Sequence, residues 1–246
     1  MTTLPYVTVS CAMSIDGYLD RADGDRLVLS NPADLDRVDE LRGQHDAIMV
    51  GASTIRRDDS SLLVKSADRR SRRIARGLSY SPAKVTVTSS GRLPRDAAFF
   101  TTGAVDRLVY CPAARVAELA GALGECAVVV GLGTEVTMRG LLEDLAARGI
   151  HRLMVEGGGT VLTQFLADGL VDELQLVIAP LFLGDEGDAR IVSRARFPWT
   201  AAHRATVSET RQIGDVVLVR YALSDRAERR AGHGASGGPV LAGRKA

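Results

Sequence analysis

The chain has 246 residues, 46% of them apolar and 25% charged, and its formal net charge at pH 7 is +1. This length and composition allow a sizeable buried core in one large or two small domains and exclude disorder over most of the chain. The near-neutral charge argues against a dedicated nucleic-acid binder, and the lack of an apolar run of roughly 20 residues argues against a membrane span.

Strand-like and helix-like segments alternate along most of the chain. Buried strands are expected at residues 6–12, 46–50, 84–88, 107–111, 127–130, 151–155 and 173–179, and helices at 32–44, 53–57, 112–123, 136–147 and 158–167. This alternation predicts an α/β fold with a mainly parallel central sheet and helices on both faces. Residues 205–210 and 216–222 predict a C-terminal antiparallel hairpin at the edge of the sheet.

Two segments lack the pattern of a packed element. Residues 69–76 hold five arginines without apolar periodicity, which predicts either a solvated loop or a lid over a phosphorylated ligand. From residue 224 onward Arg, Gly, Ala and Pro dominate the composition. One domain is therefore expected over residues 1–223 and a disordered tail over residues 224–246.

The most informative stretch is a strand that ends in Glu156 and is followed by Gly157, Gly158 and Gly159 and then by a helical pattern. Glycines without a Cβ let a phosphate approach the backbone, and the N–H groups and positive dipole end of the following helix attract negative charge. Open α/β sheets bind their ligands at such turns. The stretch predicts a phosphate cradle with a carboxylate at its lip; the alternative is a tight connection without a ligand.

The first predicted helix carries a cation on its buried side. Asn31 suits the N-cap position, and Leu35, Val38 and Leu41 form an apolar stripe. Arg42 follows Leu35 by seven residues, which points its side chain along the same stripe. A buried arginine needs a partner, which is either a structural carboxylate or a phosphate or carboxylate of a ligand.

Two further strand ends lead into polar or glycine turns. The predicted strand 46–50 runs into a glycine and a short helix that ends near Asp58, and the first strand runs into Asp16 and Gly17. Carboxyl ends of parallel strands meet at one edge of a sheet, so we expect both turns to lie near Glu156.

The turn after the strand 84–88 combines hydroxyl groups with a glycine and an arginine. Ser89, Ser90 and Arg92 would suit a phosphate monoester such as the 2′-phosphate of NADPH. The alternative is an ordinary polar turn.

No pattern of metal ligands or disulfides is visible in the sequence. Cys11, Cys111 and Cys126 are scattered and form no Cys-x-x-Cys pair, and the four histidines show no ligand spacing. We therefore expect reduced cysteines in a cytoplasmic protein and assign no residue to a metal.

Four motifs together resemble a known family. The motifs are Ser14-Ile15-Asp16-Gly17, the stretch from Asp46 to Leu62, Val155 to Gly159, and Gly169 to Leu174. Their order resembles that of the bacterial riboflavin-biosynthesis pyrimidine reductase domain, the RibD C-terminal domain. The similarity spans roughly residues 5–222. It implies a dihydrofolate-reductase-like fold and an NADPH-dependent reductase, commonly dimeric. The hydride would reduce the sugar C1′ of 5-amino-6-ribosylaminopyrimidinedione 5′-phosphate, giving a ribitylamine.

The resemblance also implies roles for individual residues. Ala12, Thr54, Asp58, Ser90 and the run from Gly158 to Gln164 would contact NADPH. With the glycine and hydroxyl turns described above, the candidate cofactor-binding residues are Ala12, Thr54, Asp58, Ser89, Ser90, Arg92, Gly157, Gly158, Gly159, Thr160, Val161 and Leu162. The candidate substrate-binding residues are Arg42, Leu62, Lys65 and Glu156. Asp58 and Glu156 are the candidate catalytic residues, as orienting groups and a proton relay.

The chain departs from the family pattern at several motif positions. Ser60 replaces the usual proline after the paired aspartates, Tyr18 follows the first Asp-Gly turn where a basic residue is common, and Lys65 stands where arginine is frequent. The zinc-deaminase signature is missing, so any deamination would be carried out by another protein.

Three functions fit the sequence. The first is reduction of the phosphorylated pyrimidine precursor of riboflavin by a cytoplasmic homodimer that binds neither nucleic acid nor membranes. The second is NADPH-dependent reduction of a dihydrofolate or another pterin. The third is a nucleotide-binding protein without catalysis, because a fold does not fix a function.

Overall fold

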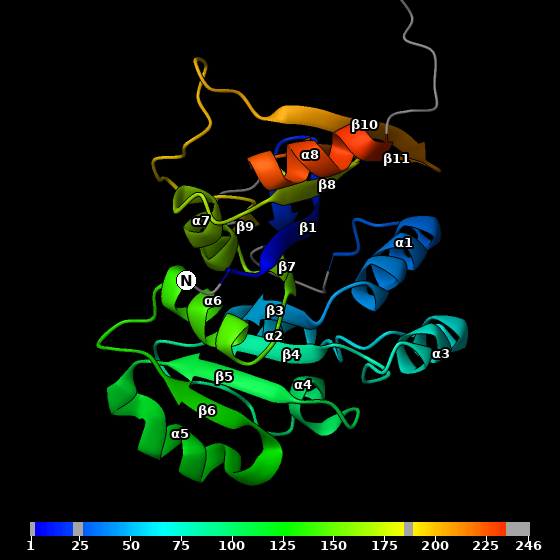
Figure 1. Ribbon diagram of the computed structural model, residues 1–246. Coiled ribbons are helices and arrows are strands. Elements are labelled where there is room, and N and C mark those ends of the chain that lie inside the picture. Colours follow the sequence, from blue (N-terminus) through cyan, green and yellow to red (C-terminus); the bar gives the residue numbers. More distant parts are fainter. Residues whose placement is uncertain (1–2, 22–26, 185–188, 235–246) are drawn as a thin grey trace, which may run out of the picture.

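A long twisted sheet runs through the middle of the molecule (Figure 1). The computed structural model describes residues 3–21, 27–184 and 189–234, within which nine strands form this sheet in the order β10-β11-β8-β1-β7-β3-β4-β5-β6. Their bounds are β1 (Tyr6–Ser14), β3 (Ala47–Gly51), β4 (Ala83–Val87), β5 (Arg107–Cys111), β6 (Val128–Gly131), β7 (Arg152–Gly157), β8 (Glu173–Ala179), β10 (Thr206–Ile213) and β11 (Val216–Ala222).

Most neighbouring strands are parallel. β1 pairs in parallel with β7 and β8, and β3, β4, β5 and β6 continue the parallel part on the other side of β7. The last two strands are antiparallel: β11 pairs with β8, and β10 forms a hairpin with β11. The predicted α/β fold with a mainly parallel sheet and a C-terminal hairpin is confirmed. A short ribbon of β2 (Tyr18–Asp20) and β9 (Ala189–Arg190) lies beside the sheet.

Helices cover both faces of the sheet, as predicted. One face packs on α6 (Met138–Ala147) and α7 (Gly159–Ala167). The other packs on α1 (Pro32–Gly43), α2 (Ala52–Asp58), α4 (Ala98–Thr101) and α5 (Val116–Leu123). Two single 3₁₀ turns, Ala113–Arg115 and Gly124–Cys126, flank α5.

Strand periodicity decides which side chains reach each face. In β7, Leu153 and Val155 are fully buried against the α7 side, while Met154 points to the α1 side. Successive strand residues alternate between the two faces, so Arg152 and Glu156 belong to the α1 side as well. The two charged residues of β7 therefore lie on the same face as α1.

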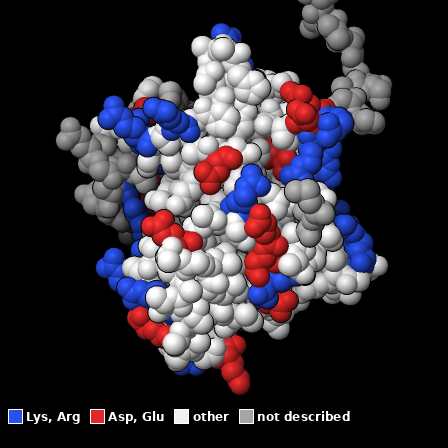
Figure 2. All heavy atoms as spheres, turned by 60° about the vertical axis from the view of Figure 1, so that its left-hand side comes forward, with Lys and Arg blue, Asp and Glu red and all other residues white. Residues whose placement is uncertain are grey.

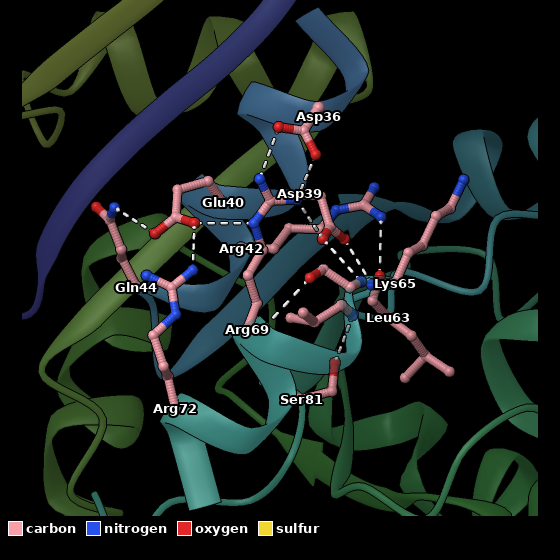
Figure 3. A network of polar contacts seen from close by, with 12 residues as sticks. Asp36, Asp39, Glu40, Arg42, Gln44, Leu63, Lys65, Arg69, Arg72 and Ser81 are labelled. Atoms are coloured by element: carbon pink, nitrogen blue, oxygen red, sulfur yellow. Dashed lines mark hydrogen bonds and ion pairs between the residues drawn. The ribbon is translucent and has the colours of Figure 1, made fainter. Parts of the chain in front are cut away.

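The arginine-rich stretch is a helix, so both predictions for it, a loop and a lid, are wrong. Residues 67–75 form α3 (Ala67–Ala75), capped by the Ser66 hydroxyl. Arg69 reaches from α3 to three carboxylates of α1, those of Asp36, Asp39 and Glu40, at 2.6 to 2.9 Å (Figure 3). Apolar periodicity could not reveal this helix because charge pairs, rather than an apolar stripe, attach it to the protein.

The predicted disordered tail begins with a helix. Residues 225–234 form α8 (Asp225–Gly234), and its Ala227 is buried in a small cluster with Tyr6 and Ala222. The expectation of disorder is therefore wrong for this segment, while residues 235–246 of the predicted tail lie outside the described residues. A single buried alanine gives too weak a periodic signal to indicate a packed helix.

The surface carries charges of both signs. On the face shown in Figure 2, basic and acidic side chains are interspersed with uncharged surface. Among the described residues, none of the helices has the length and apolar character needed to cross a bilayer.

Candidate active site

Glu156 lies at an irregularity in the pairing of β7. Met49 of β3 pairs with Val155, whereas the next residue, Val50, pairs with Gly157. Glu156 is thus the extra residue of a β-bulge, a feature that is common next to active sites. Its side chain keeps the regular alternation of β7 and points to the α1 side.

Arg42 of α1 holds this carboxylate. Its Nε and Nη2 atoms donate to the two oxygens of Glu156, each at 2.6 Å, and its Nη1 donates to the carbonyl of Leu63 at 3.3 Å (Figure 3 shows the Leu63 bond). Burial alone lowers the pKa of Arg42, but the adjacent carboxylate outweighs this effect and raises it. The geometry favours the structural-carboxylate alternative for Arg42, because both arms of the guanidinium are occupied.

The glycine turn leaves no room for a side chain. Gly158 has φ +89°, and a Cβ there would lie 3.3 Å from the Gly51 Cα and from the Thr54 hydroxyl. A Cβ on Gly159 would lie 2.7 Å from the carbonyl oxygen of Arg190. Helix α7 starts directly after Gly158, and no side chain caps its first N–H groups, a feature typical of helix starts that bind anions.

A cavity of about 280 Å³ opens at this edge of the sheet. We call it the first cavity. It lies at the carboxyl ends of β1, β3 and β7, where the sequence predicts that the turns converge. The predicted site residues that line it are Ala12, Arg42, Thr54, Asp58, Glu156, Gly157, Gly158 and Gly159.

A second cavity, of about 360 Å³, adjoins the first. Both share Ser53 and Gly158 in their walls, so the glycine turn separates two halves of one crevice. The predicted residues Ser89, Ser90, Thr160 and Val161 line the second cavity. The residues predicted to bind the cofactor phosphates and those predicted to lie near the reacting groups therefore line adjoining cavities.

Four predicted site residues line neither cavity. Leu162 is fully buried in the core, and its N–H donates to the Gly158 carbonyl within α7. Leu62 is also buried, with a strained φ of +53°, and the Lys65 side chain is exposed. Arg92 is exposed as well, and its carbonyl accepts a hydrogen bond from Arg56. Of the candidate substrate-binding residues, only Arg42 and Glu156 therefore line a cavity of the crevice.

The first cavity is also lined by polar residues that no sequence motif indicated, among them Arg37, Arg57 and Asp34. Arg37 donates to Asp34 at 2.7 Å and to Gln175 at 2.5 Å. It precedes the buried Leu41 by one helical turn, so the spacing argument used for Arg42 would have found it.

Asp34 is the least satisfied polar group of this wall. It is 1% exposed, and within the described part of the chain its Oδ2 atom has no hydrogen-bond partner. A buried acceptor without a partner is costly, which makes a ligand donor the natural complement.

Leu35, expected to be buried, is 45% exposed and lines the first cavity together with Val38. The apolar stripe of α1 therefore forms part of the wall of a cavity.

The N-cap prediction for this helix is confirmed, since the Asn31 side chain accepts from the Asp34 N–H at 2.9 Å.

The first glycine turn is held in place by its own carboxylate. Asp16 accepts from the Ser14 hydroxyl at 2.5 Å and from the backbone N–H groups of Leu183 and Gly184. The Ser14 hydroxyl bond, more than any other contact, lowers the pKa of Asp16. Asp16 is thus a structural residue that ties the end of β1 to the segment after β8.

Among the described residues, no group of three or more His, Cys, Asp or Glu side chains is arranged to hold a metal ion. The described lining of the first cavity contains arginines, carboxylates and hydroxyl groups. These groups can bind anions, accept N–H donors and move protons.

Comparison with known proteins gives the family. The sequence pattern of the RibD C-terminal domain matches residues 5–219. The chain is 39% identical over 186 residues to the 2,5-diamino-6-ribosylamino-4(3H)-pyrimidinone 5′-phosphate reductase of Archaeoglobus fulgidus, covering 73% of this chain and 82% of that protein. It is 36% identical to the reductase of the same name from Methanothermobacter thermautotrophicus, covering 89% and 98%. That relative is therefore a stand-alone domain.

Solved structures show the same fold. A pyrimidine reductase-like protein from Corynebacterium diphtheriae superimposes with a TM-score of 0.75 at 22% identity, covering 89% of this chain and 91% of that one. RibD of Acinetobacter baumannii gives 0.72 at 25% identity, and the chain spans 58% of its length. The resemblance drawn from the motifs is confirmed at the level of the family, which includes archaeal stand-alone proteins. The chain belongs to the RibD C-terminal domain family.

Proposed function

We propose that the chain is an NADPH-dependent reductase that acts on a ribosylaminopyrimidine 5′-phosphate in riboflavin biosynthesis. The observation that carries the proposal is the two-part crevice, in which the glycine turn adjoins the Arg42–Glu156 pair. Relatives at 39% and 36% identity are named as reductases of such a compound.

The cofactor proposal rests on the fit of the glycine turn. No side chain caps the start of α7, and the backbone N–H groups there suit a diphosphate. Ser89 and Ser90 lie along the second cavity and are our candidates for the 2′-phosphate that distinguishes NADPH from NADH. Bound there, NADPH supplies the hydride.

The substrate proposal assigns roles to three groups of the first cavity. Arg57 is our candidate for the substrate phosphate, because its side chain is 43% exposed, although it pairs with Asp20 at 3.0 Å. Arg37 and Arg42 are more enclosed, and each is bonded to a largely buried carboxylate. Glu156 and Asp58 line the same cavity and are our candidates for orienting the sugar and moving a proton. Arg42 then acts as a positioning residue for Glu156.

Asp34 is our candidate for recognition of the heterocycle. A 2-amino-4-oxopyrimidine presents an amino group and a ring N–H side by side, and a carboxylate can accept from both. The unpartnered Oδ2 of Asp34 suits that edge. A pyrimidinedione has an oxygen in place of the amino group, so the diamino compound named for the relatives is the better complement.

A pterin carries the same 2-amino-4-oxo edge, so Asp34 also supports the second candidate function, reduction of dihydrofolate or another pterin. The two candidates differ in the phosphate, for which the pterin has no use. A requirement for the 5′-phosphate would therefore favour the pyrimidine.

The test is a spectrophotometric assay of NADPH oxidation at 340 nm with three compounds. We expect turnover with the diaminopyrimidinone ribosyl phosphate, slower turnover with the deaminated pyrimidinedione, and none with dihydrofolate. Turnover of dihydrofolate alone would replace the first candidate by the second. NADPH binding without oxidation by any of the three would leave a nucleotide-binding protein without catalysis.

A variant tests the cradle separately. Gly158→Val should abolish NADPH binding, because its Cβ would push against Gly51 and Thr54. Gly121→Val in α5 is the matched control, since a Cβ at Gly121 meets open space. Normal NADPH affinity in a folded Gly158→Val variant would remove the cradle from the site.

We further infer a cytoplasmic homodimer. The dimer is what the family resemblance implies, and the terminal hairpin, whose Val207 and Val217 are 54% and 37% exposed, is our candidate for its interface. Light scattering of the purified chain tests the dimer, and cell fractionation tests the location.

A further inference from the structure

A third cavity lies on the α1 side of the sheet, toward the amino-terminal ends of the parallel strands. Its volume is about 480 Å³, and none of its lining residues lines the first or second cavity. The walls come from the end of α1, from β1, β7, β8, β10 and β11, and from α8. A cavity of this size is in the range of small-molecule sites.

Arg152, the first residue of β7, supplies an unsatisfied donor in this wall. Its Nε atom is buried and has no hydrogen-bond partner among the described residues. Its guanidinium lies 5.9 Å from the centre of the Tyr6 ring. A ring face attracts the cation but does not accept its in-plane N–H groups, so the donor requirement of Arg152 is unmet.

A second guanidinium, that of Arg230 in α8, lies over the same ring at 4.6 Å from its centre. Within the described ranges, neither Arg152 nor Arg230 forms an ion pair with a carboxylate at 4.0 Å or less. Burial, followed by the charge of Arg230, lowers the pKa of Arg152. Two cations held together in this way favour an anion between them.

The acidic residues of the cavity already have a partner. Arg220 donates to Glu173 and to Glu209, both at 2.8 Å. The described lining holds three arginines and two glutamates, so it carries one net positive charge. The Ser208 hydroxyl already donates to the Arg220 carbonyl, so the donors that we assign to a ligand are those of Arg152 and Arg230.

We propose that the third cavity is a second ligand site, which binds the phosphate or diphosphate group of a small molecule between Arg152 and Arg230. Guanidinium groups form paired, charge-assisted hydrogen bonds to such oxyanions. Arg230 belongs to α8, which lies beyond the matched family domain at residues 5–219. The site is therefore completed by a segment outside the matched domain.

The test is a calorimetric titration of the full chain with inorganic pyrophosphate at constant ionic strength. Every protein in the series carries Gly158→Val, which is expected to remove diphosphate binding at the glycine turn, and its thermal unfolding is compared with that of the wild type to show that it is folded. We expect Arg230→Gln to weaken pyrophosphate binding by about tenfold, as expected for loss of a charge-assisted bond. Arg229→Gln removes the same charge from the same helix outside the cavity lining, and it should change the affinity less than about twofold.

Three results would overturn the proposal. They are absence of pyrophosphate binding in the parent protein, equal losses in the Arg229 and Arg230 variants, and unchanged binding in Arg230→Gln. A second variant, Arg152→Gln, should also lose binding; its thermal unfolding is measured in parallel to show that it is folded. Arg230→Lys should recover part of the affinity but lack the paired bonds of the guanidinium.

Discussion

Helix α1 carries arginine–carboxylate pairs on two sides, and the surroundings of the pairs differ. Toward the first cavity, Arg42 and Glu156 are each 12% exposed and make two parallel bonds. Toward α3, Arg69 is 13% exposed, but its partners range from Asp39 at 7% to Asp36 at 69% (Figure 3). The Arg42–Glu156 pair is therefore enclosed by protein, whereas the cluster around Arg69 extends from buried to solvent-exposed carboxylates.

This difference in exposure shows that arginine–carboxylate pairs can position a side chain in a site or attach one helix to another. Both members of an enclosed pair lose their hydration, so the pair contributes little net stability. Loss of one partner, however, leaves the charge of the other buried and unpaired. A partly exposed cluster such as that of Arg69 attaches one helix to another, and each contact adds only a small amount of free energy to the stability of the protein. We therefore expect changes on the cavity side of α1 to affect activity as well as stability, and changes on the α3 side to affect stability alone.

The largest effect is expected for the enclosed pair. Arg42→Met should lower the free energy of unfolding by about 3–5 kcal/mol, because Glu156 stays buried without its partner. The double variant Arg42→Met and Glu156→Met should recover most of that stability but not the activity. Urea unfolding and kcat/KM are measured for both. Recovery of activity in the double variant would show that the pair is structural alone.

On the α3 side, Arg69→Met should lower the free energy of unfolding by about 2 kcal/mol, the range for hydrogen bonds to charged groups. Asp39 would keep the N–H donors of Lys65 and Ser66, so its charge is not stranded. Activity should stay at the wild-type level in the 340 nm assay. A loss of kcat comparable to that of Arg42→Met would contradict the division between the two sides.

The pH dependence of stability gives a smaller effect on the same side. Burial alone raises the pKa of Asp39, but the N–H groups of Lys65 and Ser66 and the Arg69 guanidinium outweigh it and lower the pKa. A lowered folded-state pKa contributes stability above the unfolded value of about 3.9, and this is lost as the pH falls through the folded value. The stability difference between wild type and Asp39→Asn should therefore shrink below about pH 4. A difference that is constant from pH 7 to pH 3 would contradict this.

The smallest effect is expected at the solvent edge of the cluster. Arg72 is 63% exposed and bonds Glu40 at 2.8 Å. Arg72→Ala should cost about 0.2–1 kcal/mol, and the cost should fall further in 0.5 M NaCl because salt screens exposed pairs. Thermal unfolding at two salt concentrations measures it. A loss of stability equal to that of Arg69→Met would mean that side-chain exposure does not predict how much each contact contributes to stability.

The sequence by itself determined the parallel sheet, the hairpin and the glycine turn. Apolar periods of 2 and 3.6 residues are local properties, so strands such as 173–179 and the cap at Asn31 are found where predicted. The three glycines after Glu156 are likewise a local signal, because a turn that approaches other backbone closely excludes a Cβ. Family motifs added the expected function.

Only the tertiary structure decided which distant residues meet. Arg42 and Glu156 are 114 positions apart, and their pairing requires the strand order that sets β7 beside β3 and the packing of α1 on the same face of the sheet. Helices α3 and α8 are attached by charge pairs or by little apolar surface, so they lack the periodic signal. The partner of a charged side chain depends on the fold of the whole chain, because electrostatic contacts follow distance in space rather than spacing in sequence.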